Sequence, residues 1–291
     1  MQASDVDFYR RSGAMTDGGA RAPLLDGLSR EMPALARVAQ GLLLHEHWAG
    51  AYGAALSNAR LQEPHIRSLE AMLDRLLAHD GRPLGEARAP EKRLVGNCRH
   101  FSLLFAAMLR RQGVAARARC GFGAYFEPGR FVDHWVCEYW SEDQGRWVMA
   151  DAQLDELQRA ALKLNFDPLD VPRERFLVAG EAWAQAREGK ADPEKFGIFD
   201  MHGLWFIGGN LLRDVAALNN MEMLPWDCWG AMTEAHDPWD AEKLDFFDRL
   251  AAMTRGPEVA VADLRGLYEG DERLRVPPVV FNAVLGCAET L

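Results

Sequence analysis

Apolar residues in the first third of the chain recur at the spacing of helices. Residues 23–80 contain two such stretches, "LARVAQGLLLHEHWAGAYG" and "HIRSLEAMLDRLLAHD", and recurrence at three and four residues is typical of an amphipathic helix. A loop is predicted over 80–93, where Gly, Pro and charged residues are concentrated. The next stretch, "CRHFSLLFAAMLRR", is apolar on nearly every side, which predicts a buried helix.

Beyond Gly113 the apolar residues alternate instead. The stretches "VAARARCGFGAYF", "RFVDHWVCEYW" and "RWVMADAQL" are short and rich in Val and aromatic residues, which predicts antiparallel strands. Arg117, in the first of them, is expected to pair with an acid on the sheet. From about Asn165 the pattern breaks into loops and modest helices. This order of elements predicts an α+β fold and not a wound parallel sheet.

Composition limits the classes of partner. The chain has 291 residues, of which 48% are hydrophobic, so it can bury one large core or two smaller ones. Its net charge of -10 disfavours nucleic acid and anionic membranes, because both attract clustered Lys and Arg. There is no apolar run of about 18 residues and no apolar signal segment. Five irregularly spaced cysteines indicate reduced thiols, so we expect a cytoplasmic protein.

Cys98 is predicted to open the buried helix, directly after the start signal Gly96-Asn97. The N–H groups of a helix N-terminus favour an anion, and this lowers the pKa of a thiol placed there. Two interpretations are open at this point. Cys98 is either a reactive nucleophile or a small buried hydrophobe, which is the commoner role of a buried cysteine. His100, two residues later, is expected to cap or pack locally.

The predicted hairpin brings a histidine and an acid together. With a loop over 141–144, His134 lies directly opposite Asp151, and their Cβ atoms are then about 4.5–5.5 Å apart. With the loop over 142–145 they become diagonal neighbours on the same face, whereas a slip of one residue separates them. A carboxylate beside an imidazole orients it as a base. Together with Cys98 the pair would form a Cys–His–Asp triad; alone, it would be a structural cross-strand pair.

The order "GNCRHFSLLFAAMLRRQGVAARA", "DHWVCEYW" and "GRWVMADAQLD" resembles the transglutaminase-like superfamily, whose core is the papain-like cysteine-enzyme fold. The resemblance extends from about Leu94 to Asp155. It implies a buried helix carrying Cys98, packed on an antiparallel sheet and flanked by helical segments. It also implies that Cys98 is the nucleophile, His134 the general base and acid, and Asp151 the residue that orients the histidine. Members of the superfamily form a thioester and pass its acyl group to an amine or to water.

The resemblance leaves the side-chain donor to the oxyanion unassigned. Papain-like enzymes often supply a glutamine or tryptophan from before the cysteine, and "EKRLVGN" contains neither. Trp48 and Gln62, from the N-terminal helices, are candidates for this place, and Trp135 is a further candidate for binding substrate. The chemistry requires no metal or organic cofactor. A zinc site is disfavoured because no C-x-x-C pair exists.

These observations predict a mobile tail over 1–22, a helical segment over 23–90, a catalytic core over 91–164 and a Trp-rich, mainly helical lobe over 165–291. In that lobe, "LPWDCWG" and "HDPWD" are expected to be packing anchors rather than an aromatic pocket. The expected activity is acyl transfer or hydrolysis at an amide- or peptide-type substrate, with water or an amine as the acceptor. Peptidase, amidase and amide-forming roles stay open. The competing interpretation is a non-catalytic binding or scaffold protein that retains the fold.

Overall fold

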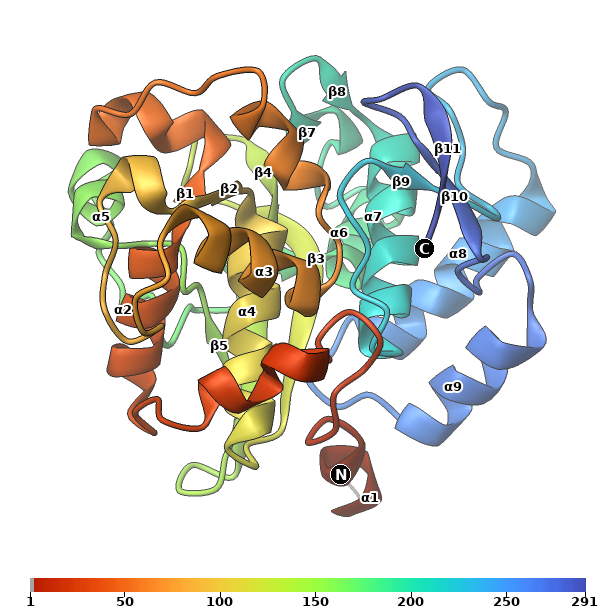
Figure 1. Ribbon diagram of the computed structural model, residues 1–291. Coiled ribbons are helices and arrows are strands. Elements are labelled where there is room, and N and C mark those ends of the chain that lie inside the picture. Colours follow the sequence, from red (N-terminus) through yellow and green to blue (C-terminus); the bar gives the residue numbers. More distant parts are fainter. Residues whose placement is uncertain (1–2) are drawn as a thin grey trace. The chain divides into compact units, whose positions relative to one another are not determined.

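The computed structural model describes residues 3–291, which form a mixture of helices and strands (Figure 1). The predicted α+β fold class is confirmed. The α-helices are α1 (Ala3–Phe8), α2 (Met32–Leu42), α3 (Leu69–His79), α4 (Cys98–Arg111), α5 (Glu156–Leu162), α6 (Ala179–Arg187), α7 (Leu204–Leu218), α8 (Ala241–Thr254) and α9 (Val261–Gly270). Short 3-10 helices are η1 (Gly19–Leu25), η2 (Glu46–Tyr52), η3 (Arg60–His65), η4 (Pro90–Lys92) and η5 (Pro193–Lys195). The strands are β1 (Leu43–His45), β2 (Leu94–Gly96), β3 (Ala116–Gly123), β4 (Phe131–Ser141), β5 (Arg146–Ala150), β6 (Phe176–Val178), β7 (Phe196–Ile198), β8 (Met201–His202), β9 (Asp227–Cys228), β10 (Val279–Asn282) and β11 (Cys287–Thr290).

The chain divides into two compact units, each built from separate segments. The first unit contains Met1–Phe8, Arg119–Trp135 and Pro172–Leu291, and the second contains Tyr9–Ala118 and Val136–Val171. Strands β3 and β4 run through both units. These segments cut across the divisions predicted at residues 22, 90 and 164, because the two units share the strands of the predicted core.

In the second unit, α4 is the central element. Every residue from Cys98 to Arg110 is buried, and α2, α3, β1 and β2 all contact the helix (Figure 1). Gly96 ends β2, and a Cβ there would lie 2.8 Å from the ring of His100. The absence of a side chain at Gly96 therefore lets the first turn of α4 pack closely on β2. The predicted buried helix is confirmed.

The helical spacing over 23–80 is correct only in part. α2 ends at Leu42, and the three leucine and histidine residues that follow form β1, which is buried throughout. The stretch then continues as η2 rather than as an α-helix. Further on, Ser68 is the N-cap of α3 and its hydroxyl accepts from the N–H of Ala71 at 3.3 Å. Ile66 shares the apolar spacing but lies before this cap.

The main sheet has the strand order β6-β3-β4-β7-β8, and β5 also pairs with β4. The β4–β5 pair is antiparallel, as predicted, and β7 adds a parallel pair with β4. Ser141 pairs with Arg146, so the hairpin loop is 142–145. The alternative loop over 141–144, which places His134 directly opposite Asp151, is wrong. The reason is Gly145, which has φ of 61° and donates to the carbonyl of Ser141 at 2.9 Å; glycine adopts this left-handed conformation without a steric penalty.

In the first unit, helices α6, α7 and α8 pack against one another (Figure 1). Trp183 of α6 stacks on Phe247 of α8, with their ring centroids 5.0 Å apart, and the ring of Trp239 lies 5.2 Å from that of Trp183. Trp229 is buried, and its Nε1 donates to the carbonyl of Leu274 at 3.0 Å. A buried tryptophan needs such a partner for its N–H. Trp229 and Trp239 are therefore packing anchors, as predicted.

The N-terminal segment differs from the mobile tail predicted for residues 1–22, of which Met1 and Gln2 lie outside the described residues. Tyr9 is fully buried, and its carbonyl accepts from the N–H of Ala116 at 3.0 Å. Thr16 is also buried, and its hydroxyl accepts from the guanidinium of Arg110 at 2.7 Å. These anchors cannot be predicted from composition, because their partners Ala116 and Arg110 lie on elements distant along the chain.

A buried ion pair joins β3 and β4 in the second unit. Arg117 Nη2 lies 2.7 Å from Glu138 Oε2, and the side chains are 1% and 0% exposed. The guanidinium also lies over the ring of Trp147, 4.1 Å from its centroid. The expected pairing of Arg117 with an acid on the sheet is confirmed. Because both charges are out of water, removal of either one takes away the opposite charge that compensates the other.

We predict that Glu138→Gln lowers the free energy of unfolding by about 3–5 kcal/mol, because it removes the carboxylate 2.7 Å from the buried Arg117 guanidinium. Urea unfolding followed by circular dichroism measures this loss. The matched control is Glu127→Gln, which removes an exposed acid 3.8 Å from Arg130 and should cost less than about 1 kcal/mol. Equal losses in the two variants would contradict the account of the buried pair.

Candidate functional site

Cys98 is the first residue of α4 and is 6% exposed. Asn97 is the N-cap, and its side-chain oxygen accepts from the N–H of Arg99 at 3.1 Å. The backbone N–H of Asn97 donates to Nδ1 of His100 at 3.2 Å, which completes a capping box. The expectations that Cys98 opens the helix and that His100 caps locally are both confirmed. The thiol therefore lies at the positive end of the helix dipole.

The parallel strands β1 and β2 determine what lies beside Cys98. His45 pairs with Gly96 at the C-terminal ends of the two strands. Both segments then continue into helical turns, η2 from Glu46 and α4 from Cys98. The segments "HEHW" and "NCRH" therefore both continue from the C-terminal edge of the β1–β2 pair, where the two strands lie side by side. Trp48 of η2 is half-buried; its role in binding substrate stays a prediction.

Glu46 at this edge carries a carboxyl group with an unusual environment. It is half-buried, and it makes no hydrogen bond or ion pair within the part of the chain that the structure describes. Burial raises its pKa to about 7. Burial lowers the pKa of the neighbouring His47. Both shifts favour the neutral form of the side chain, so this edge carries less charge than its sequence suggests.

Gln62 lies on η3 and is exposed. The next residue, Glu63, is 1% exposed, and its Oε2 accepts from the backbone N–H of Val95 at 2.8 Å. Its Oε1 lies 2.6 Å from Nε2 of His79 on α3. Glu63 thus connects η3 to β2 through its hydrogen bond with Val95, which lies two residues before the N-cap of α4. Gln62 belongs to this segment, and its role as an oxyanion donor stays a prediction.

His134 lies on β4 in the first unit and is 2% exposed. Aromatic rings surround the imidazole: the centroid of Phe126 is 4.7 Å away, that of Tyr125 5.9 Å and that of Phe176 6.2 Å. All three rings meet the imidazole in edge-type geometry. These contacts limit the rotation of the side chain and hold its ring in a defined direction.

The neighbouring Asp133 anchors β4 to α7. Asn210 Nδ2 donates to Asp133 Oδ1 at 2.8 Å, and Arg213 donates to the side-chain oxygen of Asn210 at 3.2 Å. Burial raises the pKa of Asp133. Asn210 and Arg213 were not predicted from the sequence. Their only signal is two polar residues three apart in an apolar stretch, a spacing that places both on one face of a helix.

Asp151 follows directly after β5 and is 2% exposed. Its backbone N–H donates to the carbonyl of Pro168 at 2.7 Å, so the ladder with β4 ends at Ala150. Its Oδ1 accepts from the N–H of Gln153 at 3.1 Å. Gln153 Nε2 in turn donates to Gln158 Oε1 at 3.0 Å. The carboxylate therefore belongs to a loop that is fixed by its own polar side chains.

The three predicted catalytic residues are distributed over both units. Cys98 and Asp151 belong to the second unit and His134 to the first, and the boundary falls between Trp135 and Val136 on β4. Trp135 is 1% exposed, and its Nε1 has no hydrogen-bond partner among residues 3–291. The triad and the contact of Trp135 with substrate both stay predictions.

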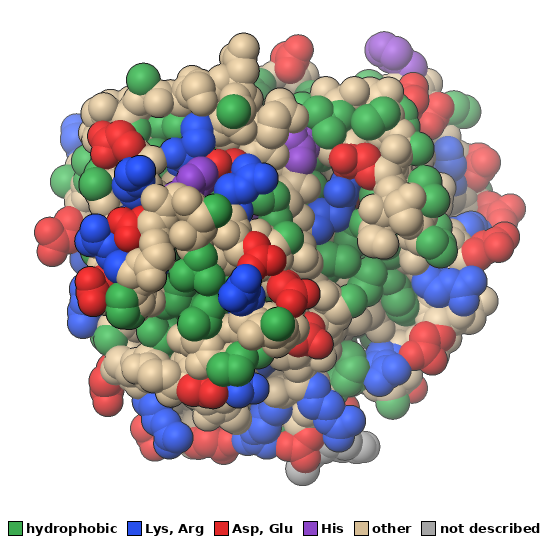
Figure 2. Space-filling model, viewed as in Figure 1, with side chains coloured by type: hydrophobic (Ala, Val, Ile, Leu, Met, Phe, Trp, Pro, Cys, Tyr) green, Lys and Arg blue, Asp and Glu red, His purple; other side chains and the backbone are tan. Residues whose placement is uncertain are grey.

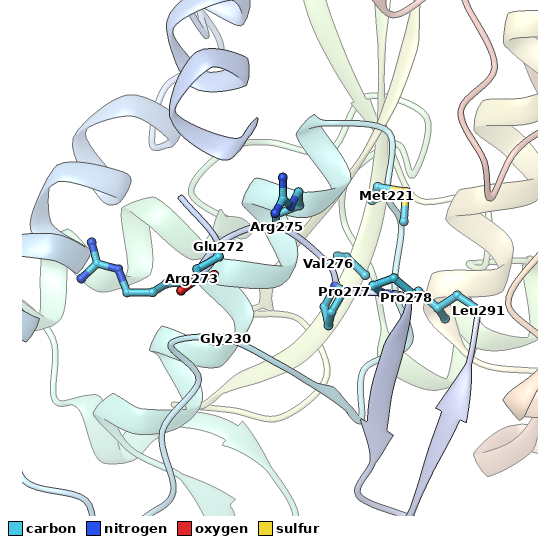
Figure 3. Close-up of a pocket in the computed structure, with 9 residues that line it drawn as sticks. All are labelled: Met221, Gly230, Glu272, Arg273, Arg275, Val276, Pro277, Pro278 and Leu291. Atoms are coloured by element: carbon cyan, nitrogen blue, oxygen red, sulfur yellow. The ribbon is translucent and has the colours of Figure 1, made fainter. Parts of the chain in front are cut away.

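A cavity of about 800 Å³ lies in the first unit. Figure 3 shows Val276, Pro277, Pro278 and Leu291 grouped at one end of it. Arg273, which also lines the cavity, is already paired with Asp271 at 2.7 Å. The predicted catalytic residues are not part of this lining. The cavity therefore adds no reactive group to the predicted chemistry.

Among the described residues, no three His, Cys, Asp or Glu side chains are placed to hold a metal ion. None of the helices within 3–291 has both the length and the hydropathy that a membrane span needs. On the face seen in Figure 2, acidic and basic side chains are interspersed.

The segment that contains the capped helix, the β4–β5 hairpin and Asp151 has relatives among known proteins. Residues 79–152 match the transglutaminase-like superfamily. The predicted resemblance to this superfamily of cysteine enzymes is confirmed for this transglutaminase-like segment. Among solved structures, the chain is similar to a "Putative Cysteine Protease" from Cytophaga hutchinsonii, with 14% sequence identity and a TM-score of 0.35. The match covers 60% of this chain and 46% of that one, so this chain spans less than half the length of that protein. No curated protein matches the sequence.

We predict that Glu46→Gln stabilises the protein at alkaline pH. Because the pKa is raised from 4.5 to about 7, the folded protein keeps a proton that the unfolded chain releases between these values. Stability is therefore fully present below pH 4.5 and is lost as the pH rises through 7. Removal of the carboxyl group should raise the free energy of unfolding by about 2 kcal/mol near pH 8 and leave it unchanged near pH 4.

Urea unfolding at the two pH values checks this prediction. Glu91→Gln, which changes an exposed glutamate before β2, is the matched control and should show no difference between them. A gain of the same size at both pH values would contradict the buried, unpaired state of Glu46.

Proposed function

We propose that the chain is a thiol-dependent enzyme that transfers or hydrolyses an acyl group at an amide bond through a thioester. Cys98 attacks the acyl carbon, His134 moves the proton and Asp151 orients His134. The observation that carries the proposal is that all three residues fall within the transglutaminase-like segment, residues 79–152. A structural pair of His134 and Asp151 would not need a cysteine at the start of a buried helix.

The position of Cys98 supports its role as nucleophile. A thiol at a helix N-terminus is favoured as the thiolate, because the N–H groups of the first turn present partial positive charge. Asn97 and His100 hold this turn through the capping box.

The observed strand register supports the partnership of His134 and Asp151. One more pair beyond Cys137 and Ala150 would set Asp151 opposite Val136. Alternation along β4 places Val136 and His134 on the same face of the strand. This is the diagonal arrangement that the loop over 142–145 predicts. A carboxylate there accepts from one ring nitrogen and leaves the other free to exchange a proton with the thiol.

The substrate that this chemistry implies is an amide or peptide. The acceptor is water or an amine, according to how well the closed site excludes water from the thioester. Formation of the acyl-enzyme is common to both reactions. An assay of that first step therefore tests the proposal without knowledge of the natural substrate.

We predict that p-nitrophenyl acetate acetylates Cys98 and releases a burst of p-nitrophenolate. Mass spectrometry of the quenched protein locates the acetyl group, and circular dichroism checks the fold. Cys98→Ala should abolish the burst and keep the fold, whereas Cys287→Ala, which removes an exposed cysteine, should leave the burst unchanged. An undiminished burst in Cys98→Ala would overturn the proposed function.

We predict that Asp151→Asn lowers kcat for this ester by about 10³–10⁴-fold, because an amide holds the imidazole in the wrong tautomer. Steady-state kinetics measures the loss. Asp143→Asn, in the exposed hairpin loop, is the control for a change of one acid to its amide and should keep the wild-type rate. If Asp151→Asn also keeps it, Asp151 does not orient the base.

A further inference from the structure

Asn97 holds the start of α4 through both its backbone and its side chain. Its carbonyl accepts from the N–H of His100 at 2.9 Å, and its own N–H donates to Nδ1 of that histidine at 3.2 Å. Its Oδ1 accepts from the N–H of Arg99 at 3.1 Å. Every rotation that carries Oδ1 away from Arg99 breaks the cap. The side chain is therefore held in one orientation.

The protonation of His100 determines which groups of Asn97 can donate. His100 is fully buried, and burial lowers its pKa to about 3, so the ring is neutral. Its Nε2 lies 3.0 Å from the carbonyl of Ile66 and must carry the proton, because a carbonyl can only accept. Nδ1 then accepts from the backbone of Asn97. Asn97 Oδ1 also lies 3.0 Å from this unprotonated Nδ1, so the bond that sets the orientation of the amide is the one from the Arg99 N–H, which requires an oxygen acceptor. The amide nitrogen is then the branch of Asn97 that points away from Arg99.

This amide nitrogen is a buried donor without a partner. Asn97 is 5% exposed, and its Nδ2 makes no hydrogen bond to any residue between 3 and 291. A buried donor left in this state costs about 1–3 kcal/mol. Such a group persists at a functional site when a ligand supplies the missing acceptor. Asn97 directly precedes Cys98, so this donor and the thiol both belong to the capped start of α4.

We propose that Asn97 Nδ2 is a side-chain donor to the oxyanion that forms during acyl transfer to Cys98, an inference that rests on the proposed function. The thiolate sulfur bonds to the acyl carbon, and one electron pair of the carbonyl double bond moves onto its oxygen. Nδ2–H donates to this oxygen and stabilises its negative charge. When the intermediate collapses, the double bond returns, and the bond to the leaving group breaks with its electron pair. In this proposal the donor comes from the residue directly before the cysteine.

The test compares a reaction that develops an oxyanion with one that does not. Attack on p-nitrophenyl acetate places negative charge on the carbonyl oxygen, whereas iodoacetamide is displaced at its methylene carbon. The main variant is Asn97→Ser, because a serine at the N-cap preserves the cap of α4 but is too short to reproduce Nδ2. Asn97→Asp, which is isosteric and cannot donate, is the second variant. Ser68→Ala removes the cap of α3 and controls for loss of a cap alone.

The expected result is that both Asn97 variants lower kcat for p-nitrophenyl acetate by about 10²–10³-fold with little change in KM. The limiting rate of Cys98 alkylation, measured at a pH where the thiol is fully ionised, should stay near the wild-type value. Ser68→Ala should keep both rates. If the wild type turns over p-nitrophenyl acetate and Asn97→Ser keeps the same kcat, this inference is wrong and the proposed function stands. The same holds if kcat and the alkylation rate fall equally in Asn97→Ser. No acylation of Cys98 in the wild type would overturn the proposed function and this inference with it.

Discussion

The structure depends on a helix N-terminus that is buried. The first N–H groups of α4 have no partners within the helix, and in the interior they cannot bond to bulk water. Asn97 caps one of them, His100 holds Asn97, and the missing side chain of Gly96 lets His100 lie against β2. The feature that begins the helix at Cys98 also concentrates partial positive charge beside its thiol. One local arrangement therefore provides for folding and for the proposed chemistry.

Strand β4 contributes residues to both units. In the second unit Glu138 holds the strand through its buried ion pair with Arg117, and in the first unit Asp133 holds it through Asn210. His134 lies between these two anchors in the sequence. Both anchors are buried polar contacts with other elements, β3 and α7, and such contacts fix a strand in one position because an alternative leaves a charge or donor unsatisfied.

The sequence predicts the elements whose signals are local. A helix that is apolar all round, alternation after Gly113 and the pairing of Arg117 all follow from patterns within a few residues. The helical spacing fails to predict β1 and η2, because the parallel pairing of β1 with β2 joins residues about fifty positions apart and overrides that spacing. Because of the same non-local pairing, the burial of Glu46 could not be predicted: the sequence "HEHW" alone carries no signal for it. The roles of Asn210 and of the unpartnered Asn97 amide could not be predicted from the sequence, because only burial in the packed structure distinguishes these groups from ordinary polar side chains.

The most direct test of the central claim is the rate of Cys98 alkylation by iodoacetamide between about pH 5 and pH 9, in wild type and in His134→Ala, mapped by mass spectrometry. Cys98 is expected to react well below the ordinary thiol pKa of about 8.5, and His134→Ala is expected to remove this advantage. Cys287, an exposed thiol in the same chain, gives the internal reference. If Cys98 follows the same pH profile as Cys287 in both proteins, no thiolate–imidazolium pair exists and the proposed mechanism is wrong.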